Sequence, residues 1–188
     1  MSKEHQIDTS SVDRMIDELI AREGGFTDHP ADRGGATRWG ITEAVARENG
    51  YDGDMAALPR DLAVSIYRSI YWEKPGFAAI AKCAPKLAEE LFDTGVNMGP
   101  AIAAGFLQRI LNALNRNGRD FADLVVDRAI GPRTLAALDR FLRLRGKAGE
   151  AVLVRAADSL QCARYIQLAE SRPANSAFVY GWLNQRVG

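Results

Sequence analysis

The chain has 188 residues, of which 47% are hydrophobic and 26% are charged, and its formal net charge at pH 7 is zero. These values indicate one large or two small folded units, and they exclude an intrinsically disordered or fibrous protein. No stretch approaches the ~18 consecutive apolar residues of a membrane span, and residues 1–6 lead into no apolar segment. We therefore expect synthesis in the cytoplasm without a signal peptide, and no insertion into a membrane.

The first predicted helix carries an acidic residue at its end. Its apolar positions recur at helical spacing and are Val12, Met15, Ile16, Leu19 and Ile20. Glu23 takes the next place on this stripe, so we expect its carboxyl to face the packed side of the helix. Partial burial raises the pKa of a carboxyl, as a general acid near neutral pH requires. Glu23 is thus the first candidate for a proton donor. The alternative is a helix-end glutamate that reaches water or pairs with Arg22 or Arg38.

A glycine-rich loop follows Glu23 and is expected to fold back beside it. Residues 24–41 hold five glycines, a proline and two aspartates, which exclude a helix and permit a short irregular hairpin. A helix resumes at Thr42, a predicted N-cap. Asp32 and Thr37 are the polar residues best placed to face Glu23. Trp39 offers a flat apolar face that suits either a sugar ring or the core.

The remaining chain predicts helices almost throughout. Their expected ranges, bounded by prolines and glycines, are 59–74, 77–82, 85–98, 101–115, 134–142, 150–171 and 174–187. Tyr71 belongs to the buried and half-buried faces of the first. Asp93 and Asn97 lie at i and i+4 on one face of the third, where they could line a groove and bind a sugar. Ordinary polar residues at a helix end would look the same.

Charge separates the two halves of the chain. Residues 1–98 hold 11 Lys and Arg against 17 Asp and Glu, a net charge of −6, whereas residues 99–188 hold 13 against 7, a net charge of +6. This asymmetry suggests two functional units. The positive half could attract anionic polymers or consist of solvated helix faces. No nucleic-acid-binding motif accompanies the arginines, so a nucleic-acid partner is not expected.

Cysteine and histidine are too few for a zinc-dependent wall amidase or peptidase. The chain has only Cys83, Cys162 and two histidines, without a Cys-x-x-Cys pair. Cys83 could be an activated thiol in a Cys–His amidase or a small buried hydrophobic residue. Pairing of Cys83 with Cys162 after export also stays open. No metal and no organic cofactor are expected.

Residues 23–42 resemble the signature of the glycoside hydrolase family 108 muramidases, lysozyme-like enzymes found as phage endolysins and secretion-associated lysozymes. The similarity lies in Glu23-Gly24-Gly25-Phe26, in Asp32-Arg33-Gly34-Gly35-Ala36-Thr37 and in Trp39-Gly40-Ile41-Thr42. It implies that Glu23 is the catalytic acid, and a wider likeness to phage lysozymes suggests Asp32 and Thr37 as its partners. The family usually has Asp-Pro where this chain has His29-Pro30.

Two later segments resemble the peptidoglycan-binding modules that accompany this family. Residues 127–135 follow the Asp-Gly-x-Ile-Gly-Pro-x-Thr pattern, with Arg128 in place of the usual glycine. Residues 181–186 resemble the Gly-Trp-Leu-Asn-Arg end of the family, with Gln185 inserted, and we expect Trp182 in the core. The resemblance implies a helical peptidoglycan-binding-like module.

The prediction is an all-α, lysozyme-like fold with a small irregular hairpin, in which a catalytic domain, 1–98, packs on a peptidoglycan-binding-like domain, 99–188. The resemblance implies an N-acetylmuramidase (a lysozyme) that cleaves the β-1,4 bond between N-acetylmuramic acid and N-acetylglucosamine. The expected catalytic residues are Glu23, Asp32 and Thr37, and the expected saccharide contacts are Trp39, Tyr71, Asp93 and Asn97. We expect a monomer that reaches peptidoglycan, in the periplasm or wall, through a holin, an export route or lysis.

Several alternatives stay open at this point. A lytic transglycosylase would act on the same bond, and a non-catalytic wall-binding or secretion-accessory protein could retain the fold. Inversion or retention depends on the carboxyl separation, about 6.5–9.5 Å against about 5–5.5 Å. The type of wall, and origin in a prophage or a secretion locus, are also open.

Overall fold

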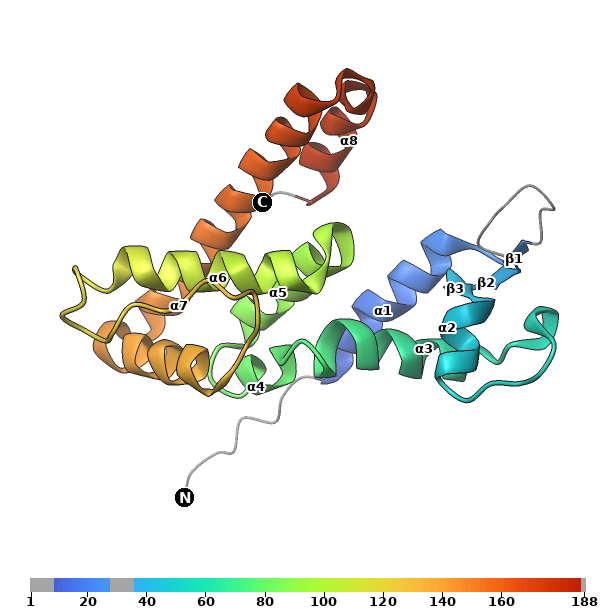
Figure 1. Ribbon diagram of the computed structural model, residues 1–188, viewed down its shortest axis with the longest axis horizontal. Helices are drawn as coiled ribbons and strands as arrows, with labels where there is room; N and C mark the ends of the chain where they lie inside the picture. Colours follow the sequence, from blue (N-terminus) through green and yellow to red (C-terminus); the bar gives the residue numbers. More distant parts are fainter. Residues whose placement is uncertain (1–8, 28–35, 187–188) are drawn as a thin grey trace. The chain divides into compact units, whose positions relative to one another are not determined.

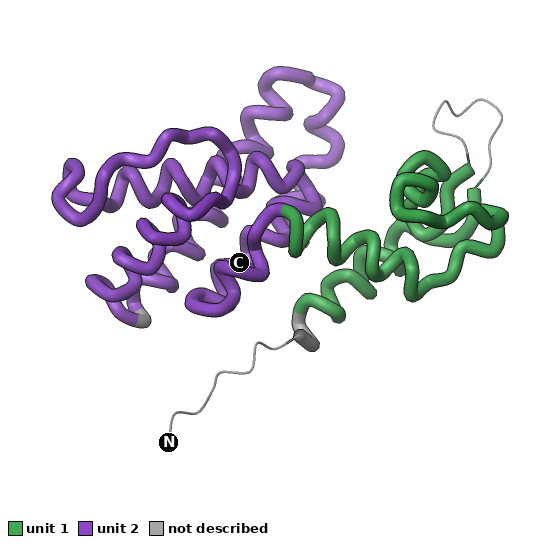
Figure 2. The backbone as a smooth tube through the Cα atoms, turned by 60° about the horizontal axis from the view of Figure 1, so that its bottom comes forward, with its two compact units in different colours: residues 1–74 green, residues 75–188 purple. Residues whose placement is uncertain are grey.

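The chain forms two compact units, residues 1–74 and 75–188, which Figure 2 distinguishes by colour. Its computed structural model describes residues 9–27 and 36–186. The predicted all-α fold with a small irregular hairpin is confirmed, and the hairpin belongs to a small three-stranded antiparallel sheet (Figure 1). None of the helices within these ranges combines the length and the apolar character that a membrane span needs.

Over its described residues the first unit contains three α-helices, a small sheet and two short helical turns. Its elements are α1 (Thr9–Glu23), β1 (Phe26–Thr27), β2 (Thr37–Arg38), β3 (Ile41–Thr42), α2 (Glu43–Glu48), η1 (Met55–Ala57), α3 (Arg60–Arg68) and η2 (Ser69–Glu73). Helix α1 packs on α3, and most of its predicted apolar stripe is buried, with Ile16 and Ile20 at 0% and 1% exposure. The pairs Arg60–Asp17, at 2.6 Å, and Arg68–Asp13 also join the two helices.

The sheet is antiparallel, with strand order β1-β2-β3. Thr37 in the central strand lies opposite Thr27 on one side and Thr42 on the other. Trp39 and Gly40, which join β2 to β3, have φ angles of 56° and 74°. Two residues with positive φ form the turn whose twist matches a two-residue hairpin. The Oγ1 of Thr42 accepts the backbone N–H of Val45 at 3.4 Å, so the predicted cap of α2 is confirmed.

Helix α3 does not end as a regular α-helix. It continues into the π-helical turn η2, in which the backbone N–H of Lys74 donates to the carbonyl of Ser69 at 2.9 Å. The wider turn shifts the side chains that follow it, and π turns within helices occur often at functional sites. Tyr71 lies within this turn.

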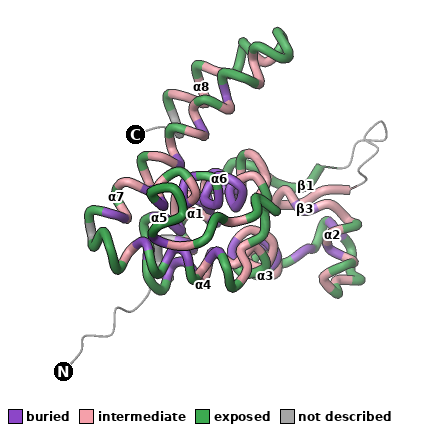
Figure 3. Tube along the Cα trace, turned by 60° about the vertical axis from the view of Figure 1, so that its left-hand side comes forward, coloured by how far each residue is buried: buried purple, intermediate pink, exposed green. Residues whose placement is uncertain are grey.

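Helices are the regular elements of the second unit over its described residues, and a long connection, 115–131, joins α6 to α7. Its elements are α4 (Phe77–Ala81), α5 (Pro85–Met98), α6 (Pro100–Leu114), α7 (Pro132–Ser171), η3 (Pro173–Asn175) and α8 (Ser176–Arg186). Helix α5 packs against α4, α6 and α7, and α6 also packs against α7. Buried residues run along most of α6, which therefore forms the centre of this unit (Figure 3).

Helix α7 is interrupted once, at Gly146, whose φ and ψ are 60° and −155°. The predicted division into two helices is thus a single-residue break. Helix α8 turns back along the end of α7, and Trp182 stacks on Tyr165 at 5.2 Å between ring centroids (Figure 1). The expectation that Trp182 is a core residue is wrong. It is half-buried because α8 packs on α7 and leaves Phe178 and Tyr180 60% and 81% exposed.

Candidate active site

Glu23 is the last residue of α1, and its side chain is exposed. The expectation of partial burial is wrong, because the helix ends there and the chain turns away at Gly24, where φ is 81°. Within residues 9–27 and 36–186, Glu23 forms no ion pair with Arg22 or Arg38. The carboxyl is thus accessible and is not neutralised by either arginine.

The aliphatic stem of Glu23 lies directly against the turn between β2 and β3. A Cβ atom added at Gly40 would lie 2.8 Å from Glu23 Cγ and 2.3 Å from the hydroxyl oxygen of Tyr67. Both distances are far below ordinary van der Waals contact, so only glycine fits here. Three segments far apart in the chain therefore meet at Gly40: the end of α1, the hairpin turn and α3.

Trp39, the other residue of this turn, has an unusual backbone conformation. Its φ of 56° lies in the left-handed region, which is strained for a bulky residue and occurs often at functional sites. The Tyr67 hydroxyl donates to the Trp39 carbonyl at 3.0 Å, and the Trp39 indole N–H donates to the Leu58 carbonyl at 3.1 Å. The Arg38 guanidinium lies 5.2 Å from the indole centroid, a cation–π contact. Trp39 is half-buried, so part of its surface stays available.

Two tyrosines stand beside the Glu23 carboxyl. The rings of Tyr67 and Tyr71 stack with centroids 5.9 Å apart and an interplanar angle of 23°. Burial, the negative charge of Glu23 and the neighbouring Tyr71 raise the pKa of Tyr67 above its usual value. Burial and the Glu23 charge also raise the pKa of Tyr71. Both phenols therefore stay protonated at neutral pH and can donate hydrogen bonds.

The structure thus brings two predicted site residues, Tyr71 and Trp39, into the surroundings of Glu23. Tyr67 was not among the site residues predicted from the sequence. The available signal was its position four residues before Tyr71, which places both rings on one face of the helix.

Of the two predicted partners of Glu23, the structure describes Thr37 and does not describe Asp32. Asp32 lies outside the described residues, so its place and the separation of the two carboxyls stay predictions. Thr37 is a half-buried residue of the central strand, three positions before Gly40. Its part in catalysis also stays a prediction.

Asp93 and Asn97 belong to the second unit and form one polar cluster, as their spacing predicts. The Asn97 side-chain amide donates to the Asp93 carbonyl at 2.8 Å and to its carboxylate at 3.0 Å. The Gln161 amide donates to the same carboxylate at 3.2 Å. Asn97 also lines a pocket of about 330 Å³ with Tyr165 and Trp182. Contact of these residues with a saccharide stays a prediction.

Glu90 is a perturbed acid that sequence reasoning missed. Burial, and then the charges of Asp158 and Asp93, raise its pKa to about 7. Its buried Oε1 has no hydrogen-bond partner among the described residues. Such a carboxyl is protonated over part of the neutral range, so the stability of the second unit should depend on pH.

The cysteines do not resemble an activated nucleophile. Both are free, and desolvation is the main cause that raises the pKa of Cys83 and of Cys162. An activated thiol shows the opposite change. Among the residues that the structure describes, no three His, Cys, Asp or Glu side chains gather as a metal site would require.

The chain is similar to known proteins along most of its length. Residues 16–99 match the glycosyl hydrolase 108 family, and residues 102–187 match a predicted peptidoglycan domain. The solved structure of Brucella abortus SagA is 25% identical, covers 94% of this chain and 89% of that chain, and has a TM-score of 0.60. No match was found among curated proteins. The two family matches adjoin near residue 100 of the sequence, whereas the boundary between the two compact units falls between residues 74 and 75. The division into domains 1–98 and 99–188 therefore stays a prediction.

Proposed function

We propose that this chain, whose residues 16–99 belong to the glycosyl hydrolase 108 family, is an N-acetylmuramidase with Glu23 as its general acid. The enzyme is a glycoside hydrolase, and its predicted peptidoglycan domain makes peptidoglycan the substrate. The finer proposal is cleavage of the β-1,4 bond between N-acetylmuramic acid and N-acetylglucosamine. The observation that carries it is the accessible Glu23 carboxyl, whose side-chain stem is held against Gly40 and which is flanked by two protonated phenols.

In the proposed mechanism, Glu23 protonates the glycosidic oxygen as the bond to the anomeric carbon breaks. A saccharide laid over the exposed carboxyl displaces water from it. Tyr71 and Trp39 supply ring faces for the sugar. Asp32, with Thr37, stabilises positive charge at the anomeric carbon or positions the attacking water.

The proposal is tested with purified walls and the variant Glu23→Gln, which keeps the shape of the side chain and removes the ionisable proton. Turbidity clearance should fall by a factor of about 100 or more, the usual contribution of general acid catalysis. The circular dichroism spectrum and melting temperature should stay unchanged. Glu18→Gln, an exposed glutamate of the same helix without an ion pair among the described residues, is the matched control and should keep full activity. Unchanged clearance by Glu23→Gln would refute the assignment of the proton donor.

The products of digestion decide which bond chemistry is used. Mass spectrometry should find muramic acid at the reducing ends, as hydrolysis requires. Anhydromuramic ends would instead identify a lytic transglycosylase. We further propose that the enzyme meets the wall as an endolysin or a secreted lysozyme, after release through a holin, an export route or lysis.

A further inference from the structure

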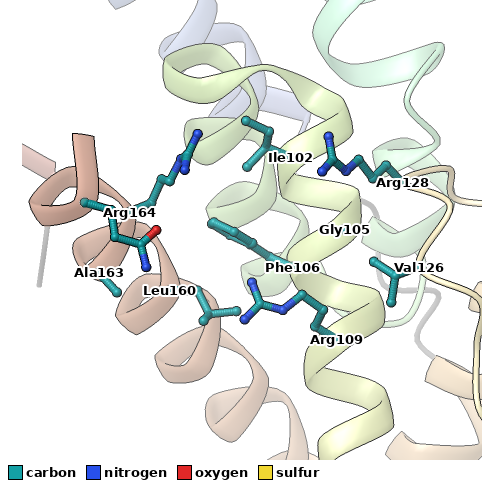
Figure 4. A pocket seen from close by; sticks show the side chains of 10 residues that line it. Ile102, Gly105, Phe106, Arg109, Val126, Arg128, Leu160, Ala163 and Arg164 are labelled. Atoms are coloured by element: carbon teal, nitrogen blue, oxygen red, sulfur yellow. The ribbon is translucent and has the colours of Figure 1, made fainter. Parts of the chain in front are cut away.

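The second unit contains a pocket of about 240 Å³ lined by arginines around an apolar floor. Phe106 and Ile102 come from α6, Leu160 from α7, and the three arginines are Arg109 on α6, Arg128 on the loop before α7 and Arg164 on α7. Figure 4 shows their side chains arranged on different sides of Phe106. Among the described residues that line the pocket, none is acidic.

The three guanidinium groups have no acceptor among the residues that the structure describes. Over residues 9–27 and 36–186, none of them takes part in a hydrogen bond or an ion pair. Arg116 and Arg143 of the same unit, in contrast, pair with Asp120 and Asp139. Like charges that line one pocket repel each other, and a bound anion would turn this repulsion into charge-assisted hydrogen bonds.

Hydrogen bonds to a buried glutamine hold the backbone around Arg128 in place. Its φ of 64° is strained for any residue but glycine, and strained residues are concentrated at binding and catalytic sites. The backbone N–H of Arg128 donates at 2.9 Å to Gln108, which is 1% exposed. The Gln108 amide in turn donates to Asp127 at 2.7 Å and to the Ala129 carbonyl at 2.9 Å. The loop is therefore tied to the buried face of α6 on both sides of Arg128.

Gly105 leaves room for the side chain of Arg128 along the surface of α6. A Cβ atom added at the buried Gly105 would lie 3.2 Å from Arg128 Cγ, so the glycine lets the arginine stem lie close along α6. A strained backbone, a buried glutamine and a glycine thus combine to aim one guanidinium at the pocket. An arginine that only faces solvent at the protein surface requires none of these three features.

We propose that this pocket binds a carboxylate of the peptide stems of peptidoglycan, an inference that rests on peptidoglycan being the substrate. Guanidinium groups bind carboxylates through paired hydrogen bonds, and the apolar floor suits the alkyl part of a short peptide. The net charge of +6 on residues 99–188 favours an anionic ligand. The pocket would hold the enzyme on the wall by a stem while the glycan is cut elsewhere.

The test is titration calorimetry of the full chain with a free tetrapeptide stem whose carboxylates are ionised. Arg109→Gln, Arg164→Gln and Arg128→Gly should each weaken binding by about threefold to tenfold or more, since each removes a charge-assisted hydrogen bond. Arg128→Gly is the sharpest variant, because glycine accepts the positive φ and should leave the melting temperature unchanged or higher. Arg155→Gln, at an exposed arginine of α7 outside the pocket, is the matched control and should bind as the wild type does.

Two further ligands identify the anion. The same peptide with amidated carboxylates should bind at least about tenfold more weakly, and the affinity for the ionised peptide should fall as salt rises. Binding of glycerol phosphate without binding of the peptide would overturn the proposal in favour of phosphate-bearing wall polymers. Equal binding of both peptides, or equal loss in Arg155→Gln, would also overturn it. The peptide contains no glycosidic bond, so these results are independent of whether Glu23 is the proton donor.

Discussion

Gly40→Ala tests the point at which the candidate active site is assembled. The added methyl group would lie 2.3 Å from the Tyr67 hydroxyl oxygen and 2.8 Å from Glu23 Cγ, and φ at this position is 74°. Either the glutamate and the tyrosine must move or the hairpin turn must open. Gly50→Ala is the matched control, because Gly50 has a φ of 83° in the same unit and no atom within 4 Å of an added Cβ.

The two variants separate backbone strain from steric contact. The left-handed conformation costs an alanine about 1–2 kcal/mol, and this is the whole expected effect of Gly50→Ala. Gly40→Ala adds overpacking of about 1–3 kcal/mol and weakens the Tyr67–Trp39 hydrogen bond, worth about 1 kcal/mol. We therefore expect losses of about 1–2 kcal/mol for Gly50→Ala and about 3–6 kcal/mol for Gly40→Ala.

Urea denaturation measures these free energies of unfolding, and wall clearance at a temperature where both variants are folded measures activity. Moving a catalytic group by about 1 Å can cost about 100-fold in rate, so Gly40→Ala should lose activity by that order. Gly50→Ala should keep its activity. Equal losses of stability in the two variants, with activity kept in both, would refute the contact between Glu23, Gly40 and Tyr67 as the basis of the site.

Three further predictions concern single polar groups. Burial raises the pKa of Glu90 to about 7. The contribution of this carboxyl to the free energy of unfolding is therefore fully present below the usual carboxyl pKa and is lost as the pH rises through 7. Glu90→Gln should therefore leave urea stability unchanged at pH 4 and raise it by ~1–2 kcal/mol at pH 8, after allowance for partial solvation; an equal or lower stability at pH 8 would contradict this. Tyr67→Phe removes the hydrogen bond to Trp39 and should lower the unfolding free energy by about 1 kcal/mol, with wall clearance measured in parallel. A fully stable Tyr67→Phe would show that the bond is not needed. Gln108→Leu leaves the Arg128 N–H without its acceptor and removes the amide hydrogen bonds to Asp127 and the Ala129 carbonyl, so it should cost about 2–4 kcal/mol in chemical denaturation, whereas a loss below ~1 kcal/mol would show that the loop does not depend on Gln108.

The helices and their boundaries could largely be predicted, because they depend on residues close in the chain. Pro85 starts α5, and the chain after Met98 starts α6 at Pro100, both with proline in the first turn. Thr42 caps α2 through a neighbour three residues away. The position of Glu23 as the last residue of its helix follows from Gly24 and Gly25 in the same way. These are local interactions, so the residues that make them are visible in the sequence.

Other features depend on the path of the chain and were mispredicted or missed. The apolar stripe of α1 suggested a buried Glu23, but a periodic pattern cannot show that the neighbouring elements leave the helix end open. The pKa of Glu90 is raised because folding buries its carboxyl and then because folding places Asp158 nearby. The break in α7 was predicted as a gap of several residues, yet a single left-handed glycine suffices.

The sequence by itself determined which segments are helical, that Glu23 is the last residue of its helix, and which family the chain resembles. Each of these follows from neighbouring residues and ordered motifs. Only the tertiary structure decided that Gly40, Tyr67 and Glu23 meet, and that Arg109, Arg128 and Arg164 share one pocket. The physical reason is separation along the chain. Local conformation depends on interactions over about four residues, whereas these groups are joined by packing between elements whose approach no short pattern encodes.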